Sequence, residues 1–251
     1  MIAPLKIGRR GVVGALLTGL LGACAKVADS APGGALLETV ERWNKGAQRL
    51  IAKRTALARE FAPADISPSF RGNGNTRPMG SAYVAHEGAG FADWRLVVSG
   101  LVERPLSLSL DQLKTLPQRT QITRHDCVEG WSAIGQWSGP QLGHILRLAG
   151  LTPGARFLVF RCADDFSGNP YYESIDLIDA FHPQTIVAHA LNGAPLPIKN
   201  GAPLRLRVER QLGYKHAKYL TGIEAVASLA GIHGGKGGYW EDRGYQWYAG
   251  I

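Results

Sequence analysis

The chain has 251 residues, of which 45% are hydrophobic and 19% are charged. This length and composition describe a folded protein with a substantial core and exclude an intrinsically disordered chain. Part of the net charge of +8 lies in the first thirty residues, and the rest of the chain has no run of Lys or Arg and no basic stripe with interleaved aromatic residues. We therefore expect no nucleic-acid partner.

Residues 1–30 have the pattern of an export signal. Arg9-Arg10 precedes the uncharged stretch 11–23, which is too short to span a bilayer. The arginine pair is typical of twin-arginine signals, which export folded proteins. Leu-Gly-Ala-Cys24 is similar to a lipoprotein cleavage box. We expect a periplasmic protein, either anchored by a lipid on Cys24 or cut a few residues later and soluble.

Residues 31–62 are predicted to form a tether followed by an amphipathic helix, and residues 63–251 a separate domain. Apolar residues recur at spacings of three, four and seven from Leu36 to Phe61, which predicts one apolar helix face. We expect this helix to pack on the domain rather than to bind a partner. Residues 62–80 contain Pro and Gly without periodicity, which indicates an irregular loop.

From Trp94 onward, predicted strands alternate with short helices. Strands are predicted at residues 94–102, 120–126, 156–163, 171–175, 185–190, 204–208 and 223–228. Asn192-Gly193 predicts a tight turn. Strands and helices interleave without regular βαβ spacing, so we predict an α+β domain with a mixed sheet.

Capping signals place the helices. Ser109 and Gln112 form a capping box that opens a short helix, and Pro117 ends it. A second helix is expected to begin at Pro140 and to end at Gly150. A third short helix is expected just before residue 183.

Cys127 is the most informative residue. It ends a predicted strand and is followed by a Gly- and Trp-rich segment, 128–139, which we expect to be a loop. A thiolate on a turn is a soft metal ligand that a bulky group can approach. The alternatives are a buried free thiol, a disulfide with Cys162, and a nucleophile paired with His125 or His144.

A second informative block lies at residues 192–218. Asn200 and Arg205 offer an amide and a guanidinium, which suit the amide-like edge of a heterocyclic ring and a phosphate. Five basic residues fall within this block: Arg205, Arg207, Arg210, Lys215 and Lys218. A solvated basic face is the alternative, but the neighbouring Gly, Tyr and Leu residues favour a loop folded against the core.

Four segments together resemble the molybdopterin-binding domain of the sulfite oxidase family. They are the segment around Cys127, Asn192-Gly-Ala-Pro-Leu-Pro, Asn200-Gly-Ala-Pro-Leu-Arg and Gly213-Tyr-Lys-His-Ala-Lys218. Its bacterial, export-targeted members include the methionine-sulfoxide reductase catalytic subunit. The resemblance covers about residues 70–250 and implies that 63–251 is a molybdopterin-binding oxidoreductase domain. It implies a molybdenum-molybdopterin cofactor, with Cys127 as the metal ligand. Asn200, Arg205, His216 and Lys218 would hold the pterin and its phosphate.

The same resemblance extends upstream. Asn73 falls on a pterin-contacting Asn of the family, and Tyr171 lies where the family has an active-site Tyr, so Cys127 and Tyr171 are the expected catalytic residues. Gly72 and Gly74 stand where sulfite oxidases have Arg and His. The loss of two basic groups disfavours sulfite and favours a neutral S-oxide or N-oxide, unless Arg71 or Arg77 compensates.

The resemblance implies an exported enzyme that transfers an oxygen atom to or from a small or protein-borne oxide. The chain shows no haem, flavin or iron–sulfur motif, so electrons are expected to be exchanged with a separate partner, a cytochrome or a membrane haem or quinone protein. A cofactor-free exported binding lipoprotein on the same scaffold is the alternative. The Gly-rich segment 234–238 lacks the Ser or Thr of a nucleotide loop, and the aromatic tail is expected only to pack. Asp126 and Glu129 flank Cys127 and are candidate proton carriers, but we expect the more common case of exposed loop carboxylates.

Overall fold

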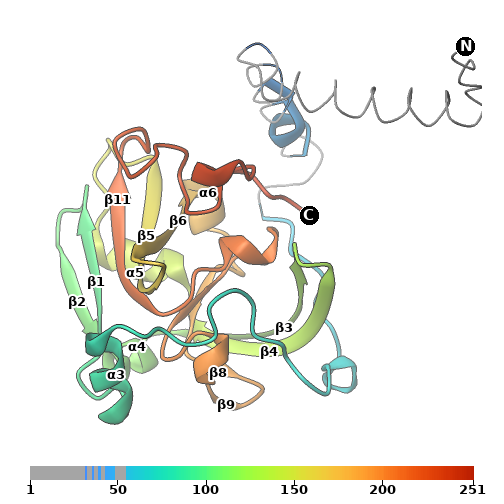
Figure 1. Ribbon diagram of the computed structural model, residues 1–251, viewed down its shortest axis with the longest axis vertical. Coiled ribbons are helices and arrows are strands. Elements are labelled where there is room, and N and C mark those ends of the chain that lie inside the picture. The colour runs from blue at the N-terminus through green and yellow to red at the C-terminus, as the bar shows by residue number, and fades with distance from the viewer. Residues whose placement is uncertain (1–31, 33–35, 37–38, 41–42, 49–54) are drawn as a thin grey trace, which may run out of the picture. The chain divides into compact units, whose positions relative to one another are not determined.

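The computed structural model describes residues 32, 36, 39–40, 43–48 and 55–251 (Figure 1). Residues 39–40 and 43–48 are helical, whereas residues 56–61 are not. The prediction of a helix that continues to Phe61 is wrong because this backbone pairs elsewhere. Glu60 forms a bridge with Thr123, and the backbone of Ala58 exchanges two hydrogen bonds with the side chain of Gln184. The predicted export signal and Cys24 lie outside the described residues.

One compact unit spans Lys53–Ile251, and its largest sheet is mixed. In spatial order its five strands are β2 (Leu106–Ser109), β1 (Arg95–Gly100), β11 (Leu220–Val226), β5 (Phe157–Phe166) and β6 (Asn169–Asp176). The β1 and β11 strands are parallel, and the other neighbours are antiparallel. This sheet confirms the predicted α+β class with a mixed sheet.

A second sheet is built on a long hairpin that curves along one side of the unit (Figure 1). Its strands are, in order, β3 (Gln118–Cys127), β4 (Trp131–Pro140), β8 (Ala190–Leu191) and β9 (Ala194–Pro195). A further pair joins β10 (Arg205–Arg207) to β7 (Ile186–Ala188). The tight turn predicted at Asn192-Gly193 connects β8 to β9, and both residues have positive φ.

The strand β4 corrects the prediction of a loop after Cys127. Every residue of β3 pairs with one of β4, from Gln118 opposite Pro140 to Cys127 opposite Trp131. The glycines that suggested a loop serve close packing instead, because a Cβ at Gly139 would collide with the backbone of Val187.

The helices are short. They are α3 (Ser81–Gly88), α4 (Leu110–Thr115), α5 (Leu142–Ala149) and α6 (Leu177–Ala180), with four 3-10 turns η1 (Pro63–Asp65), η2 (Ile198–Asn200), η3 (Gly213–Lys215) and η4 (Glu241–Arg243). The capping box of Ser109 and Gln112 is confirmed. The prediction that Pro140 begins a helix is wrong, because Pro140 ends β4 and Gln141 caps α5. No helix in the described part of the chain has the length and apolar character of a membrane span.

Two apolar clusters hold these elements together. The larger cluster packs α5, through Leu142, Ile145 and Leu146, against the five-stranded sheet. The smaller cluster joins the hairpin sheet to the β10–β7 pair and includes Phe70 and Trp137. The segments that follow β3 and β10 lie next to these clusters, so the cores fix the positions of the predicted site residues.

Candidate active site

Cys127 is presented at the end of a rigid ladder. It is the last residue of β3, and its carbonyl accepts a hydrogen bond from Gly130 N at 3.0 Å across the turn. Its side chain is buried, and its thiol is free, as is the thiol of Cys162. The alternative of a Cys127–Cys162 disulfide is therefore wrong. Burial raises the pKa of the Cys127 thiol, which is the reverse of what an unassisted nucleophile needs.

A cavity of about 190 Å³ brings five of the predicted site residues together. Its lining includes Asn73, Cys127, Tyr171, His216 and Lys218. They come from the loop before α3, the end of β3, the start of β6 and the segment after η3. Residues up to 145 positions apart in the sequence thus surround one space, with the Cys127 thiol in its wall.

Asn200 and Arg205 lie outside the lining of this cavity and form its support. The amide of Asn200 donates to the carbonyl of Arg71 at 3.0 Å. The guanidinium of Arg205 donates to the carbonyl of Asn200 at 3.1 Å and to Oδ1 of Asn73 at 3.4 Å. Both side chains are buried. Arg205 is therefore connected to the cavity through Asn73, which does line it.

The basic residues of the 192–218 block fall into two kinds. Arg207 forms an ion pair with Glu209 at 2.6 Å, and Lys215 forms ion pairs with Glu173 and Glu241, each at 2.5 Å. Arg205 and Lys218 form no ion pair within the part of the chain that the structure describes. Lys218 donates instead to the backbone carbonyls of Asn73, Asn75 and Lys199.

The environment of Arg205 and Lys218 disfavours positive charge. Burial, and then the charge of Arg207, lowers the pKa of Arg205 to about 9. Burial, and then the charge of Arg205, lowers the pKa of Lys218 to about 7. Two cations held close together without an anion form a strong site for a negatively charged group. The prediction of a folded basic loop is confirmed for Arg205, Arg207, Lys215 and Lys218, all of which are buried.

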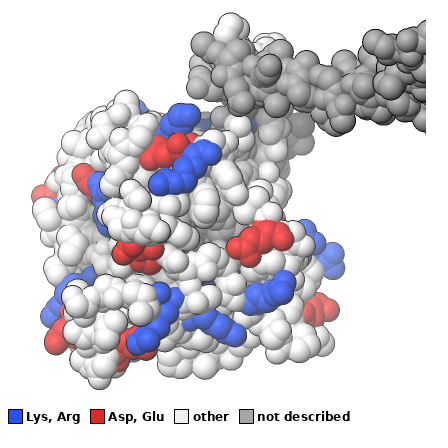
Figure 2. Space-filling view, in the orientation of Figure 1, with Lys and Arg blue, Asp and Glu red and all other residues white. Residues whose placement is uncertain are grey.

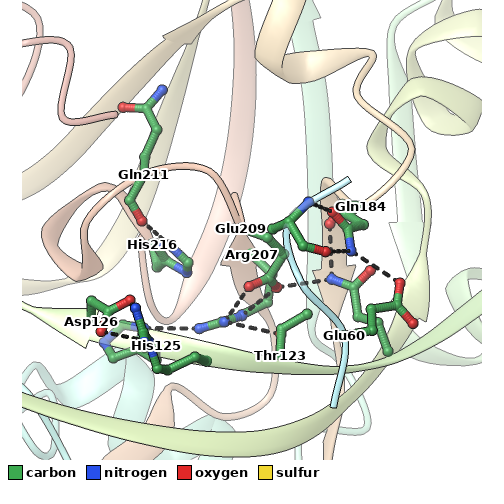
Figure 3. Close-up of polar contacts among 12 residues, drawn as sticks. Glu60, Thr123, His125, Asp126, Gln184, Arg207, Glu209, Gln211 and His216 are labelled. Carbon is green, nitrogen blue, oxygen red and sulfur yellow. Dashed lines mark hydrogen bonds and ion pairs between the residues drawn. The ribbon is translucent and has the colours of Figure 1, made fainter. Parts of the chain in front are cut away.

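Arg207 belongs to a buried polar network that joins β10 to the hairpin (Figure 3). It donates two hydrogen bonds to Glu209, at 2.9 and 2.6 Å, and one to Nδ1 of His125 at 2.9 Å. Gln121 also donates to Glu209, at 2.8 Å. Because a guanidinium can only donate, Nδ1 of His125 is the acceptor. Arg207 therefore holds strand β3, and its charge is neutralised by Glu209.

Buried atoms without partners show that the region suits a polar ligand. Among the described residues, Nε of Arg205, Nδ1 of His216 and Nε2 of His125 are buried and lack a hydrogen-bond partner. His216 lines the cavity, and the centroids of the His125 and His216 rings are 5.0 Å apart. Each such atom costs ~1–3 kcal/mol when it stays unpaired. A pterin with a phosphate offers the ring donors, ring acceptors and negative charge that these groups lack, so the residues fit this cofactor.

A metal at Cys127 would need ligands from a cofactor. Within the described ranges, no group of three or more His, Cys, Asp or Glu side chains is arranged to hold a metal ion. One thiolate alone is an incomplete ligand set for a transition metal. His125, one of the two histidines that the nucleophile alternative offers as a partner, is bonded to Arg207, and this does not favour that alternative.

Two loop glycines leave the cavity without the basic groups of sulfite oxidases. Gly74 lines the cavity with a φ of +55°, and a Cβ at Gly72 would lie 3.0 Å from the carbonyl of Lys199. Large side chains are therefore disfavoured at both positions. Arg77 is held by Glu87 at 2.9 Å, and neither Arg71 nor Arg77 lines the cavity. The predicted compensation by these arginines is not seen.

Several residues of the cavity were missed or underestimated from the sequence. Glu129 lines the cavity and accepts a hydrogen bond from Trp131 Nε1 at 3.0 Å. Trp240 and Tyr245 of the aromatic tail also line it, with rings stacked 5.3 Å apart. Asp164 lies in the lining as well. The adjacent acidic residues Asp164 and Asp165, which follow the predicted strand 156–163, were the signal that could have pointed to Asp164.

The surface carries its charges differently. Figure 2 shows acidic and basic side chains interspersed over one face of the molecule. The basic residues of the cavity region, by contrast, are buried and gathered beside Asn73. The concentrated positive charge therefore lies inside the unit, around the cavity.

This geometry agrees with the relatives of the chain. Residues 84–230 match the family of oxidoreductase molybdopterin-binding domains. A relative from Azospira oryzae, named as the protein-methionine-sulfoxide reductase subunit YedZ1, is 40% identical over 235 residues. The match covers 92% of this chain and 82% of the relative. The chain therefore belongs to the oxidoreductase molybdopterin-binding domain family and is an oxidoreductase.

More distant relatives share part of the chain. The protein-methionine-sulfoxide reductase catalytic subunit MsrP of Xanthomonas campestris is 38% identical over 147 residues, which is 54% of this chain and 46% of the relative. The match thus spans about half of that relative. The sulfane dehydrogenase SoxCD from Paracoccus pantotrophus has a TM-score of 0.51, with 22% identity over 55% of this chain and 39% of that chain. The fold is therefore of the sulfite oxidase type, as the sequence resemblance predicted.

Proposed function

We propose that the chain is an exported molybdenum-molybdopterin enzyme that removes the oxygen atom from a neutral S-oxide. The observation that carries the proposal is one cavity lined by Cys127, which has a free thiol, and by Lys218. Arg205 is connected to this cavity through its hydrogen bond to Asn73. These two cations have no ion-pair partner in the described part of the chain, and a phosphate would supply one.

Each residue of the site would have a definite role toward the cofactor. Cys127 would ligate molybdenum, and Lys218 and His216 would bind the phosphate and the pterin. Asn73, held by Arg205, would present its amide, and Asn200 would fix the loop around Arg71. The bound cofactor supplies the two-electron redox chemistry, while the protein sets access and electrostatics.

The lining of the cavity favours a neutral substrate with a thioether-like body. Among the described lining residues, Lys218 is the one Lys or Arg side chain, and the phosphate would engage it. Phe166, Trp240 and Tyr245 add aromatic faces, which pack well against sulfur and methyl groups. A methionine sulfoxide, free or in a protein, has these properties, and the names of the relatives support this class.

The remaining parts of the proposal rest on the sequence. Residues 1–30 would direct export to the periplasm, with Cys24 as the site of a lipid anchor or as part of a removed signal. Residues 31–62 would link this segment to the catalytic domain, 63–251. A separate cytochrome or a membrane haem or quinone protein would deliver the electrons.

Metal analysis of two matched variants tests the cofactor assignment. Wild type and Cys162→Ser should carry about one molybdenum per chain and reduce methionine sulfoxide with a reduced viologen dye. Cys127→Ser should remain folded but lose turnover, because the thiolate ligand is gone. Full activity in Cys127→Ser would contradict the assignment.

Steady-state assays on two substrate classes test the choice of substrate. Methionine sulfoxide and small S-oxides should be reduced, whereas sulfite oxidation with an artificial acceptor should be weak or absent. Sulfite oxidation faster than S-oxide reduction would show that the cavity holds an anion site and would overturn the proposed substrate class.

A further inference from the structure

Asp164 is an acidic residue in the cavity for which the cofactor assignment provides no role. It lies near the end of β5, its side chain is 4% exposed, and it lines the cavity with Cys127 and Tyr171. Its Oδ2 accepts a hydrogen bond from the amide of Asn75 at 3.4 Å, and its Oδ1 is buried without a partner among the residues that the structure describes. Asp164 therefore lines the cavity with one carboxyl oxygen that no other described group engages.

Three other buried carboxylates of the unit have a basic partner, which Asp164 lacks within the described ranges. Glu209 accepts two hydrogen bonds from Arg207, and both Glu173 and Glu241 are bonded to Lys215. Asp164 has no basic side chain within hydrogen-bond or ion-pair distance among the described residues. A buried carboxyl without a basic partner costs free energy, which favours a functional explanation over a structural one.

The buried environment of Asp164 favours its protonated form. The titratable groups that face it are Lys218, Asp165, Cys162, Tyr83, Tyr171 and Tyr219. Burial raises the pKa of Asp164 to about 6, against the opposing charge of Lys218. The carboxyl thus carries a proton below about pH 6 and loses it as the pH rises.

Reduction of an S-oxide needs protons at this place. The S–O bond breaks, sulfur accepts the two electrons that the electron-transfer partner delivers through the cofactor, and the oxygen leaves as water with two protons. We propose that Asp164 donates the first of these protons to the departing oxygen through Oδ1, an assignment that rests on the proposed function. The second proton comes from solvent, which also reprotonates Asp164.

Solvent can reach the cavity for this purpose. Tyr245 and Val128, which line it, are 38% and 48% exposed. Glu129 and Tyr171 also line the cavity, but their polar atoms are engaged. Glu129 accepts hydrogen bonds from Gly74 N at 3.4 Å and from Trp131 Nε1 at 3.0 Å, and the phenol of Tyr171 donates to the carbonyl of Tyr214 at 2.7 Å. Asp164 is therefore better placed than Tyr171 to deliver a proton.

The test compares Asp164→Asn with the matched control Asp165→Asn in the cofactor-loaded enzyme. Both variants remove one carboxylate from adjacent positions, but Asp165 does not line the cavity, and its Oδ1 caps Gly168 N at 2.8 Å. Asp164→Asn should lower kcat for methionine sulfoxide by about a hundredfold or more, with pterin and molybdenum contents unchanged. Asp165→Asn should stay near wild type.

Two further readouts separate proton donation from a structural role. Wild-type kcat/KM should fall as the pH rises above about 6, and this limb should be absent in Asp164→Asn. The infrared band of a protonated carboxylic acid should be lost from the cofactor-free Asp164→Asn protein relative to wild type. Asp164→Glu, which keeps an acid, should recover part of the lost kcat.

Each contrary result has its own meaning. If Asp164→Asn loses the pterin, Asp164 anchors the cofactor and the proposal is overturned. If Asp164→Asn turns over as fast as Asp165→Asn, or Asp164→Glu is no better than Asp164→Asn, the proton-donor role is overturned while the proposed function stands. If molybdenum-loaded wild type reduces no S-oxide, the proposed function itself fails, and this assignment fails with it.

Discussion

Two pairs of buried basic residues lie almost side by side in the sequence and differ in their partners. Arg207 and Lys215 are neutralised by carboxylates, whereas Arg205 and Lys218 donate to neutral oxygens. Glu173 and Glu241 raise the pKa of Lys215 despite its burial, while the pKa of Lys218, three residues later, falls to about 7.

The difference separates structural charge from functional charge. A buried cation beside carboxylates completes an ion pair and holds segments together, since removal of one partner leaves an unpaired charge. A buried cation beside carbonyls alone makes the apo protein less stable and gains its partner only when an anion binds. Burial alone therefore does not reveal the role of a basic residue, but its partners do.

The largest expected effect comes from removing a paired cation. Lys215→Met should destabilise the protein by ~3–5 kcal/mol, because it leaves Glu173 and Glu241 buried together without a counter-charge. Urea unfolding of the cofactor-free protein measures this change. Lys236→Met, at an exposed position, is the control and should be within ~0.5 kcal/mol of wild type. Equal stability of the two variants would break the distinction between the pairs.

A second change removes the carboxylate partner of a paired cation instead of the cation itself. Glu209→Gln should cost ~2–4 kcal/mol, because Arg207 would stay buried with an amide in place of its carboxylate. The loss should appear in thermal or urea unfolding at neutral pH. An unchanged unfolding midpoint would show that Arg207 needs no counter-charge.

Removal of an unpaired cation should act on the cofactor instead of the fold. Arg205→Met should change the stability of the cofactor-free protein by less than ~1 kcal/mol, because an isolated buried charge is replaced by an apolar side chain. Pterin content should fall, since a charge-assisted interaction of ~1.5–3 kcal/mol with the phosphate side of the cofactor is lost. Wild-type pterin content together with strong destabilisation would place Arg205 with the structural pair.

The smallest effect is a pH dependence at Lys218. Its lowered pKa means that the ammonium form is present below about pH 7 and is lost above it. Sulfate, whose charge is constant between pH 6 and pH 8, should therefore bind the cofactor-free protein more tightly at pH 6. Calorimetric titration measures this binding, and Lys218→Met should bind sulfate weakly and equally at both values. A pH-independent wild type would remove Lys218 from the anion site.

Local signals were sufficient for much of the fold. The side chains of Ser109 and Gln112 cap α4 through contacts three residues apart, and Asn192-Gly193 forms its turn within four residues. Such elements depend on neighbouring residues, so a single sequence predicts them. The strand β4 was missed because Gly135 and Gly139 are residues typical of loops. Here they allow close packing against Phe70 and Val187, which belong to other elements.

The sequence indicated which residues belong to the site but not which of them line the cavity and which support it. The family resemblance indicated Asn73, Cys127, Tyr171, His216 and Lys218, which the structure gathers around one cavity. The sequence does not show that Arg205 lies behind this cavity, because that depends on tertiary contacts with Asn73, 132 residues away. The role of Asp164 likewise depends on neighbours that only the folded chain supplies.

The hairpin also limits how this sequence can change over evolutionary time. The ten pairs of the β3–β4 ladder fix which side chains face inward, and Gln121, Thr123, His125 and Cys127 are the buried ones. An insertion of one residue within β3 would turn Cys127 outward and bring Asp126 to its place. Length changes in this segment therefore remove the thiol from its position in the cavity wall.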